Sequence, residues 1–225
     1  MLAVLFKLFT NYPVVLRVMG VFDVMRTKKN LKDYLFQLLY KVQFDLVVIT
    51  EDGSGTEEWA NQTLNKFSKK LILINGVDKV LKIKKNRKYY SDILFVGRLE
   101  SGKGIKEFVQ NIIYLSKKIK IKVGIIGSGP DKKLAYNLLK KNNINFFINE
   151  NVPHHQVMKY FANTKIYVSL NKRGNISNTN LEAFNNNCTM LIPNFNSPLG
   201  EVIDKSTKLL FTNETVFYYD FDKKY

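Results

Sequence analysis

The sequence predicts an α/β protein built on doubly wound parallel sheets, and two features of the chain lead to that prediction. Short runs rich in Val, Ile, Leu and Phe recur along the 225 residues, and each reads as a near-continuous apolar stretch. Longer stretches with the apolar spacing of an amphipathic helix separate these runs. Strands that are apolar on both faces and alternate with helices form parallel sheets covered on both sides. Such sheets are wound in two directions from a central strand.

The expected strands come at regular intervals along the chain. They are Val14–Val18, Asp45–Thr50, Leu71–Asn75, Asp92–Gly97, Lys122–Ile126, Ile144–Ile148, Lys165–Leu170, Thr189–Pro193 and Lys208–Phe211. The expected helices fall between them. They are Leu31–Val42, Thr56–Phe67, Lys103–Lys118, Asp131–Asn142 and Gln156–Ala162. This alternation supplies the crossover connections that parallel strands need.

A charged segment without a clear period, DKVLKIKKNRKYY, interrupts this rhythm after a turn signal at Asn75–Gly76. We interpret residues 78–90 as a linker between a first unit at residues 1–77 and a second unit at residues 91–225. The second unit holds a nearly complete series of alternating strands and helices. The first holds three expected strands, so we expect it to be part of a larger domain.

The formal net charge of +16 is the unusual feature of the composition. A basic chain can bind nucleic acid or an anionic membrane surface. Here lysine, asparagine, isoleucine, phenylalanine and tyrosine are all abundant, and no dense basic block is interleaved with aromatic residues. This pattern indicates a drift of the whole composition, and it argues against nucleic acid as a partner.

The single cysteine, Cys188, rules out an internal disulfide and suits a reducing compartment. It lies in the apolar run CTMLIP, where we expect a small buried hydrophobe. The apolar start MLAVLFKLF lacks the basic region and cleavage site of a signal peptide, and no apolar run is long enough to span a bilayer. We therefore expect a cytoplasmic protein, peripheral to the inner face of the membrane.

The loop GRLESGKG, Gly97 to Gly104, follows an expected strand, and ligands of doubly wound sheets bind beyond the carboxyl ends of the strands. Gly97 permits a close approach of the backbone, and Ser101 is placed to cap the next helix. Arg98 and Lys103 put two cations at the positive end of that helix, which is unfavourable unless an anion lies between them. A phosphate or diphosphate fits this position. Two solvated surface cations are the alternative.

The next loop is GSGP, which begins at Gly127. Its glycines and proline predict a tight turn that brings the backbone close either to a ligand or to a neighbouring strand. The third glycine of a dinucleotide fingerprint is absent. In the loop NENVPHHQV, His154 and His155 follow Pro153 at an expected helix start. Adjacent histidines face different sides of a helix, so we expect capping or solvation here rather than a shared metal ion.

The stretch NKRGNISNTNLEAF places small polar residues and one carboxylate, Glu182, at the start of a helix. One interpretation is a helix cap, because Ser, Thr and Asn side chains accept hydrogen bonds from the N–H groups of a first turn. The other is a site for an anionic, hydroxyl-rich ligand that is held by those N–H groups and by Glu182. The residues of this stretch alone leave both interpretations open.

Five segments in this order resemble the family 4 glycosyltransferases of the GT-B fold, which transfer a sugar from a nucleotide-sugar donor to an acceptor. The segments are ILINGVD at Ile72–Asp78, ILFVGRLESGKGI at Ile93–Ile105, IIGSGP at Ile125–Pro130, NVPHHQVMKYFANTKIYVSL at Asn151–Leu170 and GNISNTNLEAF at Gly174–Phe184. The resemblance covers the second unit almost throughout and the first from about Tyr12. It implies a nearly complete C-terminal nucleotide-sugar domain and a partial N-terminal, acceptor-side domain, both Rossmann-like.

The resemblance also implies roles for single residues. Arg98 and Lys103 match the pair that grips the donor diphosphate and neutralises the leaving group, and Glu182 matches the glutamate that accepts hydrogen bonds from the ribose. The implied donor-binding residues are Gly97, Arg98, Lys103, Gly127, Val152, Asn175, Ile176, Ser177, Asn178, Thr179 and Glu182. Those from Asn175 to Thr179 act through backbone N–H groups, and the backbone near Val152 holds the nucleobase edge. No metal or other cofactor is implied, because the two cations can replace a metal ion.

The chain departs from the family pattern at two positions. The family usually carries an E-x7-E motif, whose first glutamate falls here at Gly174, and Asn175 or Asn178 can take over its contacts with the sugar. A histidine often found after the first strand is replaced by Met19, which cannot shuttle a proton. The glycine-rich first loop and the C-terminal helices of the family have no counterpart here, so we expect a truncated chain.

The predicted function is retaining transfer of a sugar from a UDP-, GDP- or ADP-linked donor to a glycan or lipid-linked acceptor. One alternative is an inactive or truncated nucleotide-sugar-binding module, which Met19 and Gly174 favour. Another is a basic protein that binds nucleic acid or anionic lipid through its lysines alone.

A lysine-rich helix in the first unit predicts weak contact with anionic membranes. Its lysines are Lys28, Lys29, Lys32 and Lys41, and the apolar face beside them consists of Leu31, Leu35, Leu38, Leu39 and Val42. Each lysine near an anionic surface contributes about 1 kcal/mol. We expect the lysines to touch lipid headgroups while the apolar face packs on the sheet.

Overall fold

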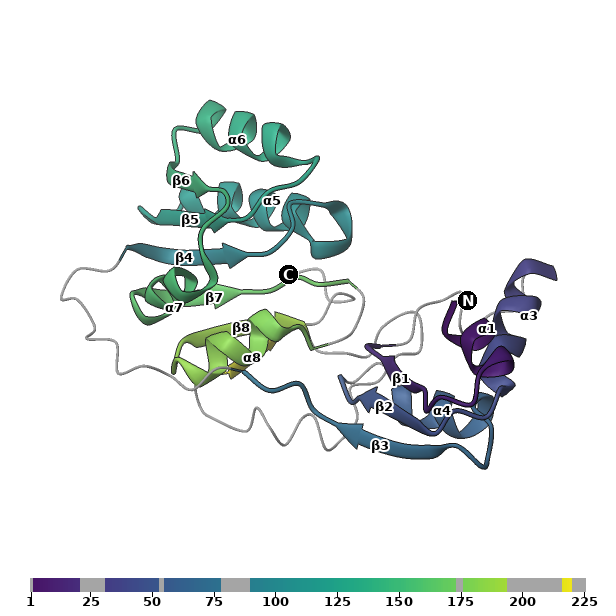
Figure 1. The fold of residues 1–225 in the computed structure, drawn as a ribbon. Helices are drawn as coiled ribbons and strands as arrows, with labels where there is room; N and C mark the ends of the chain where they lie inside the picture. Colours follow the sequence, from purple (N-terminus) through teal and green to yellow (C-terminus); the bar gives the residue numbers. More distant parts are fainter. Residues whose placement is uncertain are drawn as a thin grey trace. The chain divides into compact units, whose positions relative to one another are not determined.

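The computed structural model describes residues 2–20, 31–52, 55–77, 90–172, 176–193 and 216–219 (Figure 1). The chain divides into two compact units, and each is described here by itself. Among the described residues, the first unit runs to Gly76 and the second begins at Val77. The linker expected at residues 78–90 lies outside the described residues except for Tyr90.

The first unit has a three-stranded sheet in the order β1-β2-β3, with β1 at Val15–Val18, β2 at Leu46–Thr50 and β3 at Lys69–Leu73. Both neighbouring pairs are parallel, so that Val15 lies beside Leu46, and Leu46 beside Lys69. The predicted parallel arrangement is confirmed, although β3 begins and ends earlier than the expected Leu71–Asn75.

The helical elements of the first unit are α1 (Leu2–Phe9), α3 (Leu31–Leu38), a 3-10 turn η1 (Leu39–Lys41) and α4 (Thr56–Thr63). The sequence did not lead us to expect α1. Its position is held by Asp45, whose carboxylate accepts hydrogen bonds from Lys7 Nζ and from the Val14 N–H, each at 2.7 Å. The core of this unit combines buried Val47 and Ile49 of β2 with Trp59 of α4.

The apolar face of α3 does not pack as predicted. Leu31, Leu35 and Leu38 are 72%, 53% and 43% exposed, so the expectation that this whole face lies in the core is wrong for these residues. Leu39 and Val42 do pack against the core. Among the described side chains of α3, that of Gln37 is buried, at 8% exposed, and the chain changes to a 3-10 turn after Leu38. Lys28, Lys29 and the side chain of Lys32 lie outside the described residues.

The second unit has a six-stranded sheet in the order β6-β5-β4-β7-β8-β9. The strands are β4 (Ser91–Val96), β5 (Lys122–Ile126), β6 (Asn145–Asn149), β7 (Thr164–Val168), β8 (Thr189–Pro193) and β9 (Val216–Tyr219). All neighbours are parallel. The strand expected at Lys208–Phe211 lies outside the described residues, and β9 was not predicted. The strand order reverses between β4 and β7, which is the position where doubly wound sheets bind ligands.

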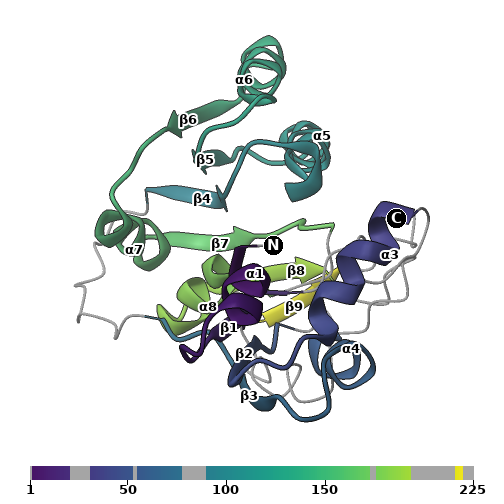
Figure 2. The same ribbon diagram turned by 45° about the vertical axis from the view of Figure 1, so that its right-hand side comes forward.

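Four helices connect the strands of the second unit: α5 (Ile105–Ser116), α6 (Lys132–Lys141), α7 (His154–Ala162) and α8 (Asn178–Asn185). Figure 2 shows α5 and α6 on one face of the sheet and α7 and α8 on the other. Right-handed crossovers require this, because the chain moves outward from β4 to β6 and then returns through β7 to β8. The predicted doubly wound α/β fold is confirmed.

The main core of the second unit lies between its sheet and α5. Phe95 of β4 meets Phe108 of α5 with ring centroids 5.2 Å apart, and Ile125 and Ile105 are fully buried in the same cluster. Burying one side chain of this size stabilises a protein by about 1.5–3 kcal/mol. This packing holds the amino-terminal end of α5 beside the loop that follows β4. Before β8, Cys188 is 4% exposed, as predicted.

Within the described ranges, none of the helices has the length and apolar character needed to cross a bilayer.

Candidate donor site

The loops that follow β4, β5, β6 and β7 emerge at one edge of the sheet, because the carboxyl ends of parallel strands point the same way. The loops after β4 and β5 are joined directly. The Gly97 N–H donates to Ile126 O at 3.0 Å, and the Leu99 N–H donates to Ser128 O at 2.8 Å. Two backbone hydrogen bonds therefore fix the loop that carries Arg98 beside the loop after β5.

Gly127 explains why the GSGP turn needs glycine. A Cβ atom at this position would lie 1.9 Å from Gly97 O, and its φ of +137° is one that other residues rarely adopt. The sequence left open whether the backbone of this turn approaches a ligand or a neighbouring strand. The structure shows that it approaches the neighbouring loop after β4. The Gly127 N–H donates to Asn149 O at 3.0 Å. The N–H of Gly127 is therefore engaged within the protein.

Gly104 joins the loop after β4 to the loop after β7. It has a φ of +75°, and a Cβ there would lie 2.2 Å from Leu170 O. Beside it, the Lys172 N–H donates to Gly102 O at 3.1 Å. No separate role for Gly104 was predicted from the sequence, because its partner Leu170 lies far along the chain. These contacts bring the start of α5 and the approach to α8 to one place.

Ser101 does not cap α5, so that prediction is wrong. A 3-10 turn, η2 (Ser101–Lys103), precedes the helix, and the N-cap of α5 is Gly104, which makes no side-chain cap. Ser101 instead accepts the Gly104 N–H through its backbone carbonyl at 3.0 Å. The reason is the left-handed conformation of Gly104, which ends the turn before the helix begins.

Arg98 and Lys103 both belong to the segment between β4 and α5. The Arg98 side chain is 65% exposed and pairs with Glu100, its Nη2 lying 3.0 Å from Glu100 Oε1. An exposed pair of this kind contributes about 0–1 kcal/mol, so it is easily exchanged for a pair with a ligand anion. Lys103 is half-buried at the end of η2, immediately before the helix N-terminus.

Ser177 caps α8, which confirms the helix-cap interpretation of the polar stretch. Its Oγ accepts the Asn180 N–H at 3.3 Å and donates to Asn180 Oδ1 at 3.1 Å. Tyr167 of β7 donates to the same Oδ1 at 3.0 Å. Burial raises the pKa of Tyr167, so this hydroxyl stays a donor at physiological pH. These bonds fix the start of α8 on the sheet.

The predicted donor-binding residues at this helix start differ in their surroundings. The Ile176 side chain is buried, Thr179 is half-buried, and Asn178 is exposed. The first turn of any helix presents N–H groups that have no intrahelical acceptor, and the helix dipole makes this end attractive to anions. Gly174 and Asn175 lie outside the described residues.

Glu182 lies in the second turn of α8, and its side chain is 13% exposed. Its Oε1 lies 2.8 Å from Nε2 of His154, the first residue of α7. The expected solvation of His154 is confirmed, because its side chain is 57% exposed. Its hydrogen bond with Glu182 was not predicted, because it joins residues 28 positions apart in sequence. One signal in the sequence could have indicated this pair. His154 directly follows Pro153 at an expected helix start, and that start lies at the same edge of the sheet as the start of α8.

Val152 precedes α7 in the loop after β6 and is half-buried. In the part of the chain that the structure describes, its N–H donates no hydrogen bond and its C=O accepts none. A residue whose backbone donor and acceptor are both open can meet the edge of a nucleobase.

Two further observations concern chemistry. Met19 follows β1 in the first unit and is 63% exposed. Among the described residues, no group of three or more His, Cys, Asp and Glu side chains is close enough to hold a metal ion.

The parallel sheets and the loop cluster of the second unit define an α/β protein of the GT-B type. The family of glycosyl transferases group 1 matches residues 77–216, and the chain belongs to this family. No curated protein matches the sequence.

Solved structures show the same fold. Sucrose-phosphate synthase from Thermosynechococcus elongatus has a TM-score of 0.66 at 13% identity, over 84% of this chain and 52% of that one. HepE from Anabaena, in complex with UDP and glucose, has a TM-score of 0.65 at 9% identity, over 96% and 60%. The pneumococcal O-GlcNAc transferase GtfA, in complex with UDP and GlcNAc, has a TM-score of 0.61 at 15% identity, over 83% and 38%. The chain thus spans between about two fifths and three fifths of these proteins.

Proposed function

We propose that the protein transfers a sugar, with retention of anomeric configuration, from a nucleoside-diphosphate sugar to a glycan or lipid-linked acceptor. The observation that carries this proposal is the convergence of two cations, a capped helix N-terminus and a carboxylate at one sheet edge. Two contacts join the loops that carry these groups. They are the close approach of Gly104 to Leu170 and the hydrogen bond from the Lys172 N–H to Gly102 O.

Each group suits one part of such a donor. Arg98 and Lys103 neutralise the diphosphate, and most of the negative charge that develops on the leaving group falls there. The first-turn N–H groups of α8, including that of Thr179, bind the phosphates and the donor sugar, as helix N-termini bind anions. Glu182 accepts hydrogen bonds from the ribose hydroxyls, and the Val152 peptide pairs with the base.

The family supports the reaction class, and so do the neighbours GtfA and HepE, whose structures contain UDP together with a sugar. We propose UDP, GDP or ADP as the nucleotide. We also propose that the reaction needs no metal ion, because Arg98 and Lys103 supply the positive charge that a divalent cation would otherwise place on the diphosphate.

Ligand-dependent stability tests the donor site. UDP, GDP and ADP are added separately to the full chain, and its thermal unfolding is followed with and without EDTA. A ligand that binds the folded state alone raises the free energy of unfolding by about 2.7 kcal/mol at about 100 times its Kd. We expect one of the three nucleotides to raise the free energy of unfolding, and we expect EDTA to leave that rise unchanged. If millimolar concentrations of all three leave unfolding unchanged, the donor site is wrongly assigned.

Product analysis tests the transfer itself. The chain is incubated with radiolabelled nucleotide-sugar and mixed glycan acceptors, and the anomeric proton of the product is examined by NMR. Retention predicts the same anomeric configuration in donor and product. Donor binding without any transfer would instead identify a binding module, for which Met19 and Gly174 provide the reason.

A further inference from the structure

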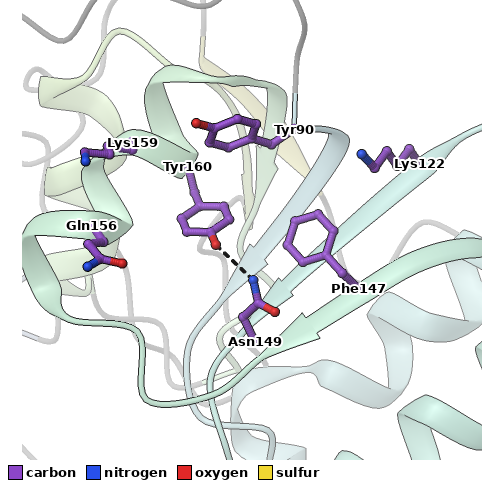
Figure 3. Close-up of a pocket in the computed structure, with 7 residues that line it drawn as sticks. All are labelled: Tyr90, Lys122, Phe147, Asn149, Gln156, Lys159 and Tyr160. Carbon is purple, nitrogen blue, oxygen red and sulfur yellow. Dashed lines mark hydrogen bonds between the residues drawn. The ribbon is translucent and has the colours of Figure 1, made fainter.

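A groove of about 370 Å³ runs along α7 on the sheet of the second unit, and three aromatic rings form its centre (Figure 3). Tyr160 lies between the other two. Its ring centroid is 5.5 Å from that of Tyr90, which precedes β4, and 5.9 Å from that of Phe147 in β6. None of the predicted donor-binding residues lines this groove.

Polar groups around the rings have unused hydrogen-bonding capacity. Asn149 Nδ2 donates to the Tyr160 hydroxyl at 2.9 Å. In the described structure, this leaves the Tyr160 O–H hydrogen without an acceptor and Asn149 Oδ1 without a donor. The Gln156 side chain, one turn before Tyr160 on α7, adds a second carboxamide. The groove therefore offers donors and acceptors close together on one side of an aromatic surface.

The groove is positively charged. Lys122 at the start of β5 and Lys159 on α7 line it, and no carboxylate does. Neither ammonium group forms an ion pair with any other described residue. The nearby carboxylate of Asp92 is already engaged: Lys165 Nζ lies 2.6 Å from Oδ1, and the Lys122 N–H donates to Oδ2 at 2.8 Å.

We propose that this groove is a second binding site, for a negatively charged saccharide. Aromatic rings pack against the apolar C–H faces of a sugar ring, and the carboxamides and the Tyr160 hydroxyl match vicinal hydroxyl groups. The two ammonium groups select a carboxylate, sulfate or phosphate substituent. The volume of the groove is at the lower end of the range for small-ligand sites, which suits a short segment of a saccharide. The site does not depend on the proposed donor site.

Calorimetric titration with hexagalacturonate tests the proposal, with maltohexaose as the neutral counterpart. We expect the acidic hexamer to bind and the neutral one to bind at least about tenfold more weakly, because a hydrogen bond to a charged group is the stronger kind. Equal affinity for both hexamers would overturn the role of the lysines.

Two double variants separate the groove from the general charge of the chain. Lys122→Gln/Lys159→Gln should weaken binding about tenfold or more, whereas Lys117→Gln/Lys120→Gln, which removes the same charge from exposed positions outside the groove, should leave it unchanged. Equal losses in both would show that the binding is non-specific electrostatic attraction, and the proposal would be wrong.

A third variant and a second ligand complete the test. Tyr160→Phe keeps the ring and removes the hydroxyl, so it should weaken binding of the acidic hexamer by about threefold to tenfold. An unchanged melting temperature shows that the variant keeps its fold. A uridine hexanucleotide that binds more tightly than hexagalacturonate, with the same dependence on Lys122 and Lys159, would identify a nucleic-acid site instead.

Discussion

Nε2 of His154 lies 2.8 Å from Oε1 of Glu182, and this hydrogen bond joins the first residue of α7 to the second turn of α8. It holds one oxygen of a carboxylate that is 13% exposed and leaves the other oxygen to a ligand. A carboxylate held in one orientation loses less conformational freedom on binding. His154 is therefore a candidate positioning residue for the contact that we propose between Glu182 and the ribose.

His154→Gln should weaken the binding of UDP and of uridine by the same factor, about threefold to tenfold, because both ligands contain the ribose. His155→Gln is the matched control: His155 is the next residue, is exposed and makes no contact with Glu182. Calorimetry of both variants with both ligands measures this. Tighter binding in His154→Gln would mean that the imidazole competes with the ribose.

Lys103→Ala and Glu182→Gln should weaken donor binding by different routes. Lys103 is assigned to the diphosphate, so its loss should reduce UDP affinity by about tenfold to a hundredfold and affect uridine little. Glu182 is assigned to the ribose, so its change should reduce the affinity of both ligands about equally. If the two variants have identical effects on uridine, these roles are wrong.

Gly127→Ala should destabilise the second unit. The new methyl group would lie 1.9 Å from Gly97 O at a φ of +137°, and backbone strain of this kind costs about 1–3 kcal/mol before any overpacking is added. Urea denaturation measures the loss. Gly76→Ala is the control, since nothing lies within 4 Å of a Cβ there, and it should be neutral or slightly stabilising. Similar losses in both would contradict the close contact between the two loops.

Asp92→Asn should lower stability at neutral pH and have little effect in acid. The hydrogen bond from Lys165 lowers the pKa of Asp92, and the Lys122 N–H contributes in the same direction. The folded-state pKa is therefore below the unfolded value of about 3.9, so the stabilisation is complete above that value and disappears as the pH falls through the folded pKa. Because Asp92 and Lys165 are 29% and 54% exposed, we expect about 1 kcal/mol or less. Urea denaturation at pH 7 and at pH 2.5 measures the free energy of unfolding of Asp92→Asn and of the unchanged protein. If the two proteins differ by the same amount at both pH values, the pairing of Asp92 with Lys165 is contradicted.

The exposed leucines of α3 give a test of membrane contact. We predict weak binding of the chain to anionic vesicles that salt reduces, and none to neutral vesicles. Leu31→Ser/Leu35→Ser should reduce pelleting with anionic vesicles, because both side chains are more than half exposed. Tyr114→Ser, an exposed aromatic position of α5 in the second unit, is the control. Equal pelleting with neutral and anionic vesicles, or none at low salt, would rule out this contact.

The local pattern of apolar and polar residues was sufficient to predict most helices and strands of the fold. β5 and β8 have the boundaries expected from the sequence, and α5 begins within two residues of its expected start. A buried strand needs a continuous apolar run and an amphipathic helix needs a spaced one, and both signals lie within a few residues of sequence. The polar start of α8 was readable for the same reason, since Ser177 caps a helix that begins at the next residue.

Contacts between distant segments needed the tertiary structure. The pair of His154 and Glu182, the contact of Gly104 with Leu170 and the groove around Tyr160 each join residues from different strands or helices of the sheet. A sequence shows which residues are polar, small or aromatic, but strand order decides which of them meet. The leucines before Val42 are a smaller case, because Leu31, Leu35 and Leu38 of α3 are exposed whereas Leu39 in the following 3-10 turn packs against the core. The sequence by itself therefore determined the parallel α/β class and the loops that carry candidate ligand groups. The packing of those loops decided which groups act together, because hydrogen bonds and ring contacts depend on distances that sequence separation does not specify.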